Sequence, residues 1–167
     1  MRKYQRGAHV VYGAHGACVI LDIEKKRVDK KLIEYYVLEP VDGPGIRYYI
    51  PTENEVAVAK LKDVLSEQQV HQLLASEQVR RDAWIEDEGQ RKQRYKELIT
   101  SGDRTALVSM IHTLHKHRDQ QVKNGKKLHM CDENFLRDAE KLLDSEIALA
   151  LQISQDEVGE VVKNAMK

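Results

Sequence analysis

Four histidines and a cysteine in the second half of the chain have the side chains best suited to hold a metal ion. The cluster consists of His112, His115 and His117, with His129 and Cys131 further on. His112 and His115 are three residues apart, which places both imidazoles on one face of a helix. No HExxH, CxxC or facial carboxylate pattern accompanies them, however, and Lys116 and Arg118 would repel a cation. We interpret the cluster as the solvated basic end of a helix, and a metal-dependent enzyme is the less favoured alternative.

Other residues with catalytic side chains also lack the partners that a reaction would need. Gly43-Pro44-Gly45 indicates a turn, because neither a Gly-Lys-Ser/Thr ending nor a helix follows it. His15 has no pair of nucleophile and carboxylate near it in the sequence, so we interpret it as a turn residue. Cys18 lies in an apolar run, which favours a place in the core. We therefore expect a protein that is not an enzyme and that holds no metal and no cofactor.

The overall composition indicates a globular protein without a bulk attraction to nucleic acid. The 167 residues include 27 Lys and Arg and 27 Asp and Glu, so the formal net charge is zero. Only a local basic patch could therefore attract nucleic acid. No apolar run approaches the roughly 20 residues that a membrane helix needs, and the basic N-terminus lacks the apolar core of a signal peptide. The two cysteines lie in unlike contexts. We expect no disulfide, a cytoplasmic location and no membrane partner.

Residues 8–60 are rich in β-branched and aromatic residues and indicate a small β domain. The predicted strands cover residues 9–12, 17–25, 32–38, 46–51 and 56–59. Turn signals separate these runs, among them Gly13, Gly16 and the Gly-Pro-Gly turn. Short strands at this spacing predict a small barrel or a strongly bent sheet, in which glycine allows unusual dihedral angles.

From residue 65 the period of the apolar residues becomes helical. Ser66 and Gln69 form the capping-box pattern of a first helix, and a second helix is predicted over residues 80–99, ending at Ser101-Gly102. Asp103 caps a third helix that ends at residues 124–125, a fourth begins at about residue 132, and residues 154–157 open a short fifth. We predict an α+β protein, with a small β barrel in residues 1–62 and an all-α domain of about five helices in residues 63–167.

The predicted second helix carries the only tryptophan and a basic run. Trp84 is either a structural residue packed between the two domains or an exposed anchor for a partner or an unstacked base. The acidic residues 86–88 beside it should be repelled by DNA, which favours the structural alternative. The basic run flanks Tyr95 and consists of Arg91, Lys92, Arg94 and Lys96. Four cations within six residues cannot all be buried, so they are candidates for contacts with phosphate, although a charged helix face is usually only solvated.

Several segments, taken in order, resemble the CarD family of bacterial transcription regulators. The N-terminal segments are "GAHVVYGAHGACVILDIEKK", "EYYVLEP" and "YYIP", and the most specific part is Val-Val-Tyr-x-x-His-Gly at Val10 to Gly16. They resemble a module that this family shares with the RNA-polymerase-interacting domain of transcription-repair coupling factor. The helical segments "RYKELITSGD" and "AEKLLDSEIALAL" resemble the second and fourth helices of the family. The resemblance covers residues 5–165.

The resemblance implies a Tudor-like β barrel that docks on the β subunit of RNA polymerase through a strand edge. It also implies a helical domain that contacts promoter DNA at the upstream edge of the transcription bubble and modulates open-complex stability. By position, Lys26 matches a basic residue that the family uses against polymerase, and Tyr49 stands at the second such position. Arg47, two residues before Tyr49, is expected on the same strand face. We expect weak, polymerase-tethered DNA binding by a monomer.

The helical half departs from the family pattern in two places. The commonest members carry Trp-x-Arg-Arg-Tyr, whose tryptophan wedges against the bubble edge, whereas here Arg91 stands at that place and Trp84 lies seven residues earlier. The basic residues that precede a Met-Leu pair in the fourth helix of those members correspond here to Glu133 and Asn134, before Phe135-Leu136. A polymerase-binding adaptor without DNA contact is therefore the alternative to a DNA-contacting regulator.

Overall fold

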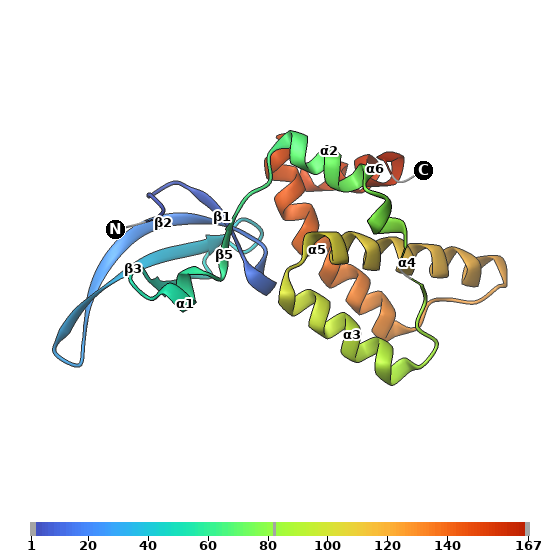
Figure 1. The fold of residues 1–167 in the computed structure, drawn as a ribbon, viewed down its shortest axis with the longest axis horizontal. Helices are drawn as coiled ribbons and strands as arrows, with labels where there is room; N and C mark the ends of the chain where they lie inside the picture. Colours follow the sequence, from blue (N-terminus) through green and yellow to red (C-terminus); the bar gives the residue numbers. More distant parts are fainter. Residues whose placement is uncertain (1–2, 82, 166–167) are drawn as a thin grey trace. The chain divides into compact units, whose positions relative to one another are not determined.

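The chain consists of two compact units that divide between Val64 and Leu65. The computed structural model describes residues 3–81 and 83–165 (Figure 1). The first unit is a β-sheet and the second is helical, so the protein is α+β as predicted. In the described residues, no helix is both long enough and apolar enough to cross a membrane.

The first unit is a five-stranded antiparallel sheet in the order β4-β3-β2-β1-β5. Its strands are β1 (His9–Tyr12), β2 (Ala17–Val28), β3 (Lys31–Pro40), β4 (Tyr48–Pro51) and β5 (Leu61–Asp63). A bulge between Ile20 and Asp22 shifts the register of β2 against β3, which bends the sheet. The layout is Tudor-like. The two end strands of the sheet are β4 and β5.

One face of this sheet carries the core. Side chains that alternate along the strands point inward, as in Ile20 opposite Leu38 and Tyr36 opposite Ile50, and all four are buried. The Tyr36 hydroxyl accepts hydrogen bonds from the backbone N–H groups of Lys3 and Tyr4, at 2.9 and 3.2 Å. The chain before β1 is therefore attached to the core.

The structure corrects two details of the predicted β domain. Residues 56–59 are not a strand, because the Asn54 side chain accepts a hydrogen bond from Ala57 N–H and caps a one-turn helix, α1 (Glu55–Val58). The last strand is β5 instead. The glycines act between strands, in the 3-10 turn η1 (Gly13–His15) that joins β1 to β2. Gly13, with φ 42°, is the first residue of this turn, and Gly16, with φ 78°, follows its last residue.

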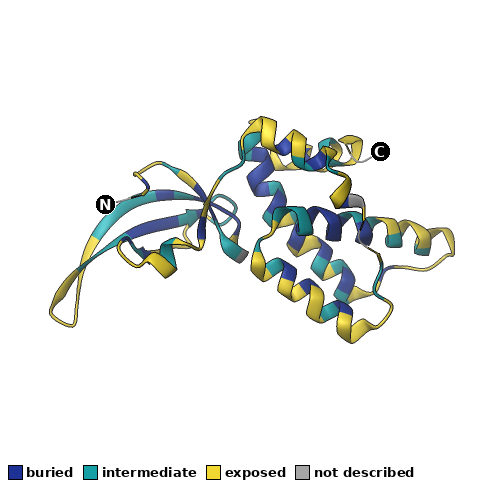
Figure 2. Ribbon diagram, viewed as in Figure 1, coloured by how far each residue is buried: buried dark blue, intermediate teal, exposed yellow. Residues whose placement is uncertain are grey.

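The second unit packs its α-helices around one apolar core (Figure 2). The helices are α2 (Glu67–Ala75), α3 (Glu88–Ser101), α4 (Arg104–Lys123), α5 (Met130–Leu151) and α6 (Gln155–Ala165), with a 3-10 turn, η2 (Glu77–Arg80). The predicted capping box is confirmed, since Ser66 and Gln69 hydrogen-bond reciprocally. Asp103 caps α4, and Gly102 is left-handed with φ 66°.

The second predicted helix begins too early. α3 starts at Glu88, where the Asp87 side chain accepts a hydrogen bond from Gln90 N–H, and not at residue 80. Trp84 and Ile85 precede this cap in a segment without helix or strand. A helix through residues 81–87 would lose that cap, so the local hydrogen bond sets the boundary.

Candidate functional site

Lys26 and Tyr49 lie against each other on the outer face of the first unit. The Lys26 Nζ is 3.8 Å from the centroid of the Tyr49 ring, and Tyr35 meets the same ring edge to face at 6.3 Å. Tyr35 neighbours the core residue Tyr36, so alternation along β3 turns it to the opposite face. The structure thus brings together two of the three predicted polymerase-binding residues in a cation–π contact.

The strand that carries Tyr49 is an edge. β4 pairs only with β3, and among the described strands none pairs with its other side. Tyr49 is 41% exposed. Arg47 is exposed too, but it precedes β4, so its predicted place on the strand is wrong by one residue. The edge offers backbone N–H and C=O groups beside an aromatic and cationic surface.

His15 and Cys18 have structural surroundings. His15 Nδ1 lies 3.0 Å from the Tyr48 hydroxyl, and its ring packs on Tyr12 and Tyr48. It therefore joins the turn before β2 to β4. Cys18 is fully buried in the sheet core, as predicted. Burial and the nearby charge of Asp42 raise the pKa of the Cys18 thiol to about 12, so the thiol stays protonated.

Arg91 does not lie on the solvated face of α3. It is 3% exposed, and its Nε and Nη2 donate to the two carboxylate oxygens of Asp132, both at 2.9 Å. Its Nη1 donates to the carbonyl of Ile85 at 2.9 Å. Asp132 has no exposed surface. The expectation of a phosphate contact is corrected for Arg91, whose charge is used inside the helical unit.

Trp84 packs onto this buried pair. Its ring stacks on His117 with centroids 3.5 Å apart and planes 7° apart, and the Arg91 guanidinium carbon lies 4.4 Å from the ring centroid. The ring is half-buried and packs against the core of the helical unit. Burial lowers the pKa of His117, and the charges of Arg91 and His129 lower it further.

The remaining cations of the basic run lie on two flanks of α3. Arg91, Tyr95 and Leu98 form the buried stripe of the helix. At 100° per residue, Lys92 and Lys96 fall on one side of this stripe and Arg94 on the other. Arg94 and Lys96 are exposed, and Lys92 forms an ion pair with Glu88 at 3.2 Å, which lowers the pKa of that carboxyl group.

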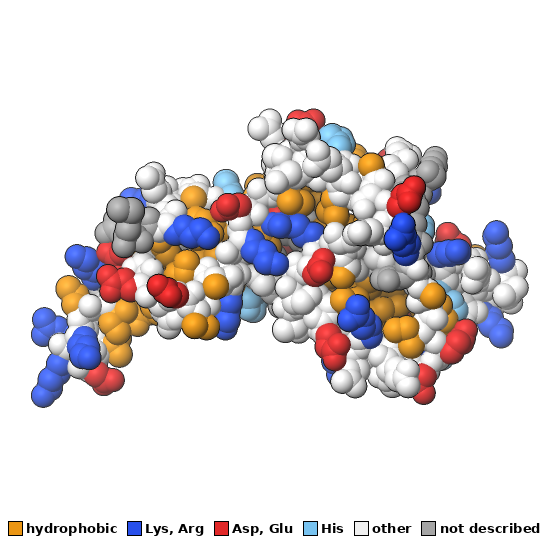
Figure 3. Space-filling view, in the orientation of Figure 1, with side chains coloured by type: hydrophobic (Ala, Val, Ile, Leu, Met, Phe, Trp, Pro, Cys, Tyr) orange, Lys and Arg blue, Asp and Glu red, His pale blue; other side chains and the backbone are white. Residues whose placement is uncertain are grey.

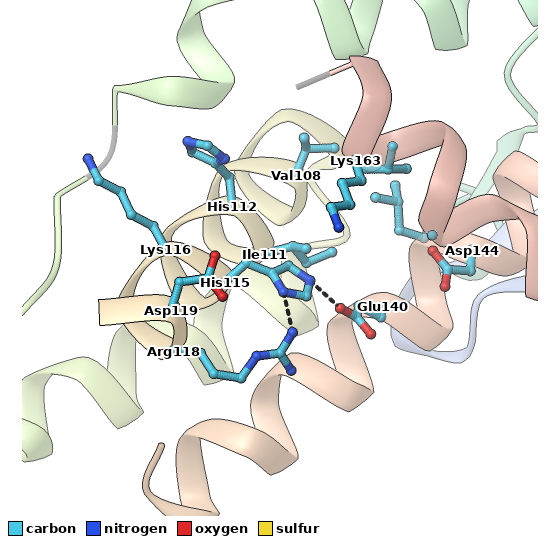
Figure 4. A pocket seen from close by; sticks show the side chains of 13 residues that line it. Val108, Ile111, His112, His115, Lys116, Arg118, Asp119, Glu140, Asp144 and Lys163 are labelled. Carbon is cyan, nitrogen blue, oxygen red and sulfur yellow. Dashed lines mark hydrogen bonds and ion pairs between the residues drawn. The ribbon is translucent and has the colours of Figure 1, made fainter. Parts of the chain in front are cut away.

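The histidine cluster of α4 lines a cavity of about 570 Å³ between α4, α5 and α6 (Figure 4). Arg118 donates to His115 Nδ1 at 2.7 Å, and His115 Nε2 lies 2.6 Å from a Glu140 oxygen. Because a guanidinium only donates, Nδ1 accepts and Nε2–H donates to Glu140. His117 stacks on Trp84 instead. Within residues 3–81 and 83–165, no three His, Cys, Asp or Glu side chains are grouped to hold a metal ion.

Comparison with protein-family models decides the family. The model for the CarD-like/TRCF RID domain matches residues 4–62, and the model for the CarD C-terminal domain matches residues 69–163. The chain belongs to the CarD family. It is a transcription factor that interacts with RNA polymerase, and the family is one of regulators and not of enzymes. The first unit is the polymerase-interacting domain.

The sequence analysis missed the two buried acids of the helical unit. Asp132 binds Arg91, and Glu146 accepts hydrogen bonds from Arg104 at 2.7 and 2.8 Å and from Leu65 N–H at 3.0 Å. Both acids lie on the apolar stripe of α5 that includes Leu136 and Leu143. An acidic residue within the apolar stripe of one predicted helix, and an arginine within the stripe of another, would together indicate a buried ion pair.

Proposed function

We propose that this CarD family protein docks on the β subunit of RNA polymerase by strand addition to β4. The observation that carries the proposal is the unpaired β4 edge with Tyr49 and Lys26 stacked beside it. A strand of the partner would pair with the free backbone groups of β4. The side chains of Tyr49, Lys26 and Arg47 would fix the register of that strand and favour a partner with negative charge. A protein with this partner works in the cytoplasm, and we propose that it docks as a monomer.

We further propose that the helical unit contacts promoter DNA near the bubble edge and modulates open-complex stability. Lys92, Arg94 and Lys96 supply the charge for phosphate contacts, without the buried Arg91. Three cations on two helix flanks give weak binding to free duplex that salt reduces strongly. Trp84 is assigned mainly to structure, because its ring is already covered by His117 and Arg91.

A polymerase-binding adaptor without DNA contact is the second candidate. The burial of Arg91 and the presence of Glu133 and Asn134 before Phe135-Leu136 favour it, because both reduce the positive charge at the surface. The two candidates differ in one measurement. A regulator changes the lifetime of promoter open complexes, whereas a bare adaptor binds polymerase and leaves that lifetime unchanged.

The docking proposal is tested by reversing charges at the β4 edge. Lys26→Glu with Arg47→Glu should weaken binding of purified β subunit at least about 10-fold, because each reversal replaces an attraction with a repulsion. Both side chains are exposed, so the melting temperature should not change. Lys60→Glu with Lys62→Glu, two exposed residues at β5, is the matched control and should bind normally. If the folded Lys26→Glu and Arg47→Glu double variant bound the β subunit with unchanged affinity, these residues would not be part of the docking surface.

A further inference from the structure

The hairpin formed by β2 and β3 is longer than the sheet that it belongs to. β2 and β3 have 12 and 10 residues, whereas β1 and β4 have 4 each. β4 pairs with β3 only at residues 35–38, and β1 pairs with β2 only at residues 17–19. Residues 25–32, here called the hairpin tip, are therefore a two-stranded ribbon that extends away from the rest of its unit (Figure 1).

Core packing does not account for this tip. All eight of its residues are exposed, including Val28 at 40% and Leu32 at 63% (Figure 2). An isolated two-stranded ribbon is marginally stable in water, because it has no apolar face to bury. Shortening the hairpin would remove no buried side chain. The length of the tip points to a contact with a partner.

The tip is strongly cationic (Figure 3). Five of its residues are basic and one, Asp29, is acidic. The basic residues are Lys25, Lys26, Arg27, Lys30 and Lys31. None of them forms an ion pair with a described acidic residue, and Lys26 alone has a ring contact. In a chain with zero net charge, this local excess is a binding feature.

The cations occupy both faces of the ribbon. Paired residues share a face, so the pairs Arg27–Leu32 and Lys25–Glu34 place Lys25 and Arg27 on one side. The pair Val28–Lys31 and the alternation along β2 place Lys31 and Lys26 on the other. A flat acidic protein surface would engage one face only. The major groove of a duplex admits a two-stranded ribbon and has phosphates along both walls.

The turn at the apex keeps a cation in an unfavourable conformation. Asp29 and Lys30 form a two-residue turn in which both residues have positive φ, 49° and 64°. Such turns favour Asn or Asp followed by Gly, because the left-handed region is unfavourable for a residue with a long side chain. Glycine at residue 30 would relieve this conformation and lose the charge. Lysine at this place indicates that the apical charge is used.

We propose that the hairpin tip binds the phosphate backbone of double-stranded DNA, with Arg27, Lys30 and Lys31 as the contacts. The contact is separate from the strand addition at β4, which uses Lys26 and Tyr49. It gives the polymerase-interacting unit a DNA contact of its own. Val28 and Leu32 supply exposed apolar groups for the groove.

The test measures binding of the full-length protein to a fluorescent 20-base-pair duplex as salt is varied. Arg27→Gln with Lys30→Gln and Lys31→Gln should lower the affinity at low salt at least about 10-fold. The slope of log K against log salt should fall by about 2 to 3, since each lost phosphate contact removes about 0.9. The matched control neutralises three exposed lysines after and at the end of α4, Lys123, Lys126 and Lys127, and should keep the parent slope.

A single substitution separates binding from folding. Lys30→Gly should raise the melting temperature, because glycine suits the turn, and should still weaken duplex binding. A salt slope of the triple variant equal to that of the parent would overturn the proposal. Loss of β-subunit binding by the triple variant with unchanged duplex binding would overturn it too, by showing that the tip contacts polymerase.

Discussion

At the residue scale, the buried pair of Arg91 and Asp132 determines what its neighbours can do. Two charge-assisted hydrogen bonds and the carbonyl of Ile85 satisfy the guanidinium, which in turn lies over the Trp84 ring. Removing either partner would leave an uncompensated buried charge, which costs about 3–5 kcal/mol. The pair therefore holds α3, α5 and the segment before α3 together, and its charge is not available to a phosphate.

Acid should destabilise the protein through His117. Burial, Arg91 and His129 lower its pKa below the ordinary 6.5, while Asp132 and Glu86 act in the opposite direction. The unfolded chain therefore binds the proton more tightly, so stability is full above about pH 6.5 and falls with pH until the folded group also titrates. His117→Gln removes this proton and should flatten the dependence of the melting temperature on pH between 7 and 5. Parallel pH curves for the two proteins would contradict the assignment.

At the element scale, local hydrogen bonds were readable from the sequence and tertiary packing was not. The Ser66–Gln69 box and the Asp103 cap are confirmed because a few neighbouring residues specify them. The predicted start of α3 was wrong because the Trp84 ring packs on His117 of α4, which no local pattern reports. For the same reason Arg91 was predicted at the surface: its partner Asp132 is 41 residues away. The family resemblance named Lys26 and Tyr49 one by one, but the cation–π contact between them was not predicted.

Trp84 should act as a structural clamp for the segment before α3. Trp84→Ala removes a half-buried ring with its stack on His117 and should destabilise the helical unit by about 2–4 kcal/mol. Trp84→Phe keeps an aromatic ring for the stack and should lose less than half of that. Chemical denaturation of the three proteins measures both effects. A shortened or lengthened open-complex lifetime with an unchanged melting temperature in Trp84→Ala would instead identify the ring as a wedge.

At the scale of the whole molecule, a neutral chain divides its contacts between two units. Polymerase docking lies in the first unit, and the cations of α3 lie in the second. Each proposed DNA contact would be weak alone, but docking on polymerase would make DNA binding intramolecular, with an effective concentration in the millimolar range for short connections. The function proposed here therefore depends on both units being in one chain.

This dependence predicts how variants of the two units should differ in an open-complex assay. Lys92→Gln with Arg94→Gln and Lys96→Gln should leave β-subunit affinity unchanged and abolish most of the effect on open-complex lifetime at every protein concentration. This variant loses the phosphate contacts proposed near the bubble edge, whereas the hairpin tip of the first unit keeps its own. The variant Lys26→Glu with Arg47→Glu should have no effect on open-complex lifetime at low protein concentration. The effect should return only when the concentration of the variant is raised at least about 10-fold, since its DNA-binding cations are intact and only the tethering to polymerase is lost. If the docking variant stayed inactive at high concentration, then docking would be doing more than raising local concentration. If the α3 variant kept full activity, the adaptor alternative would hold and the helical unit would regulate without touching DNA through these residues.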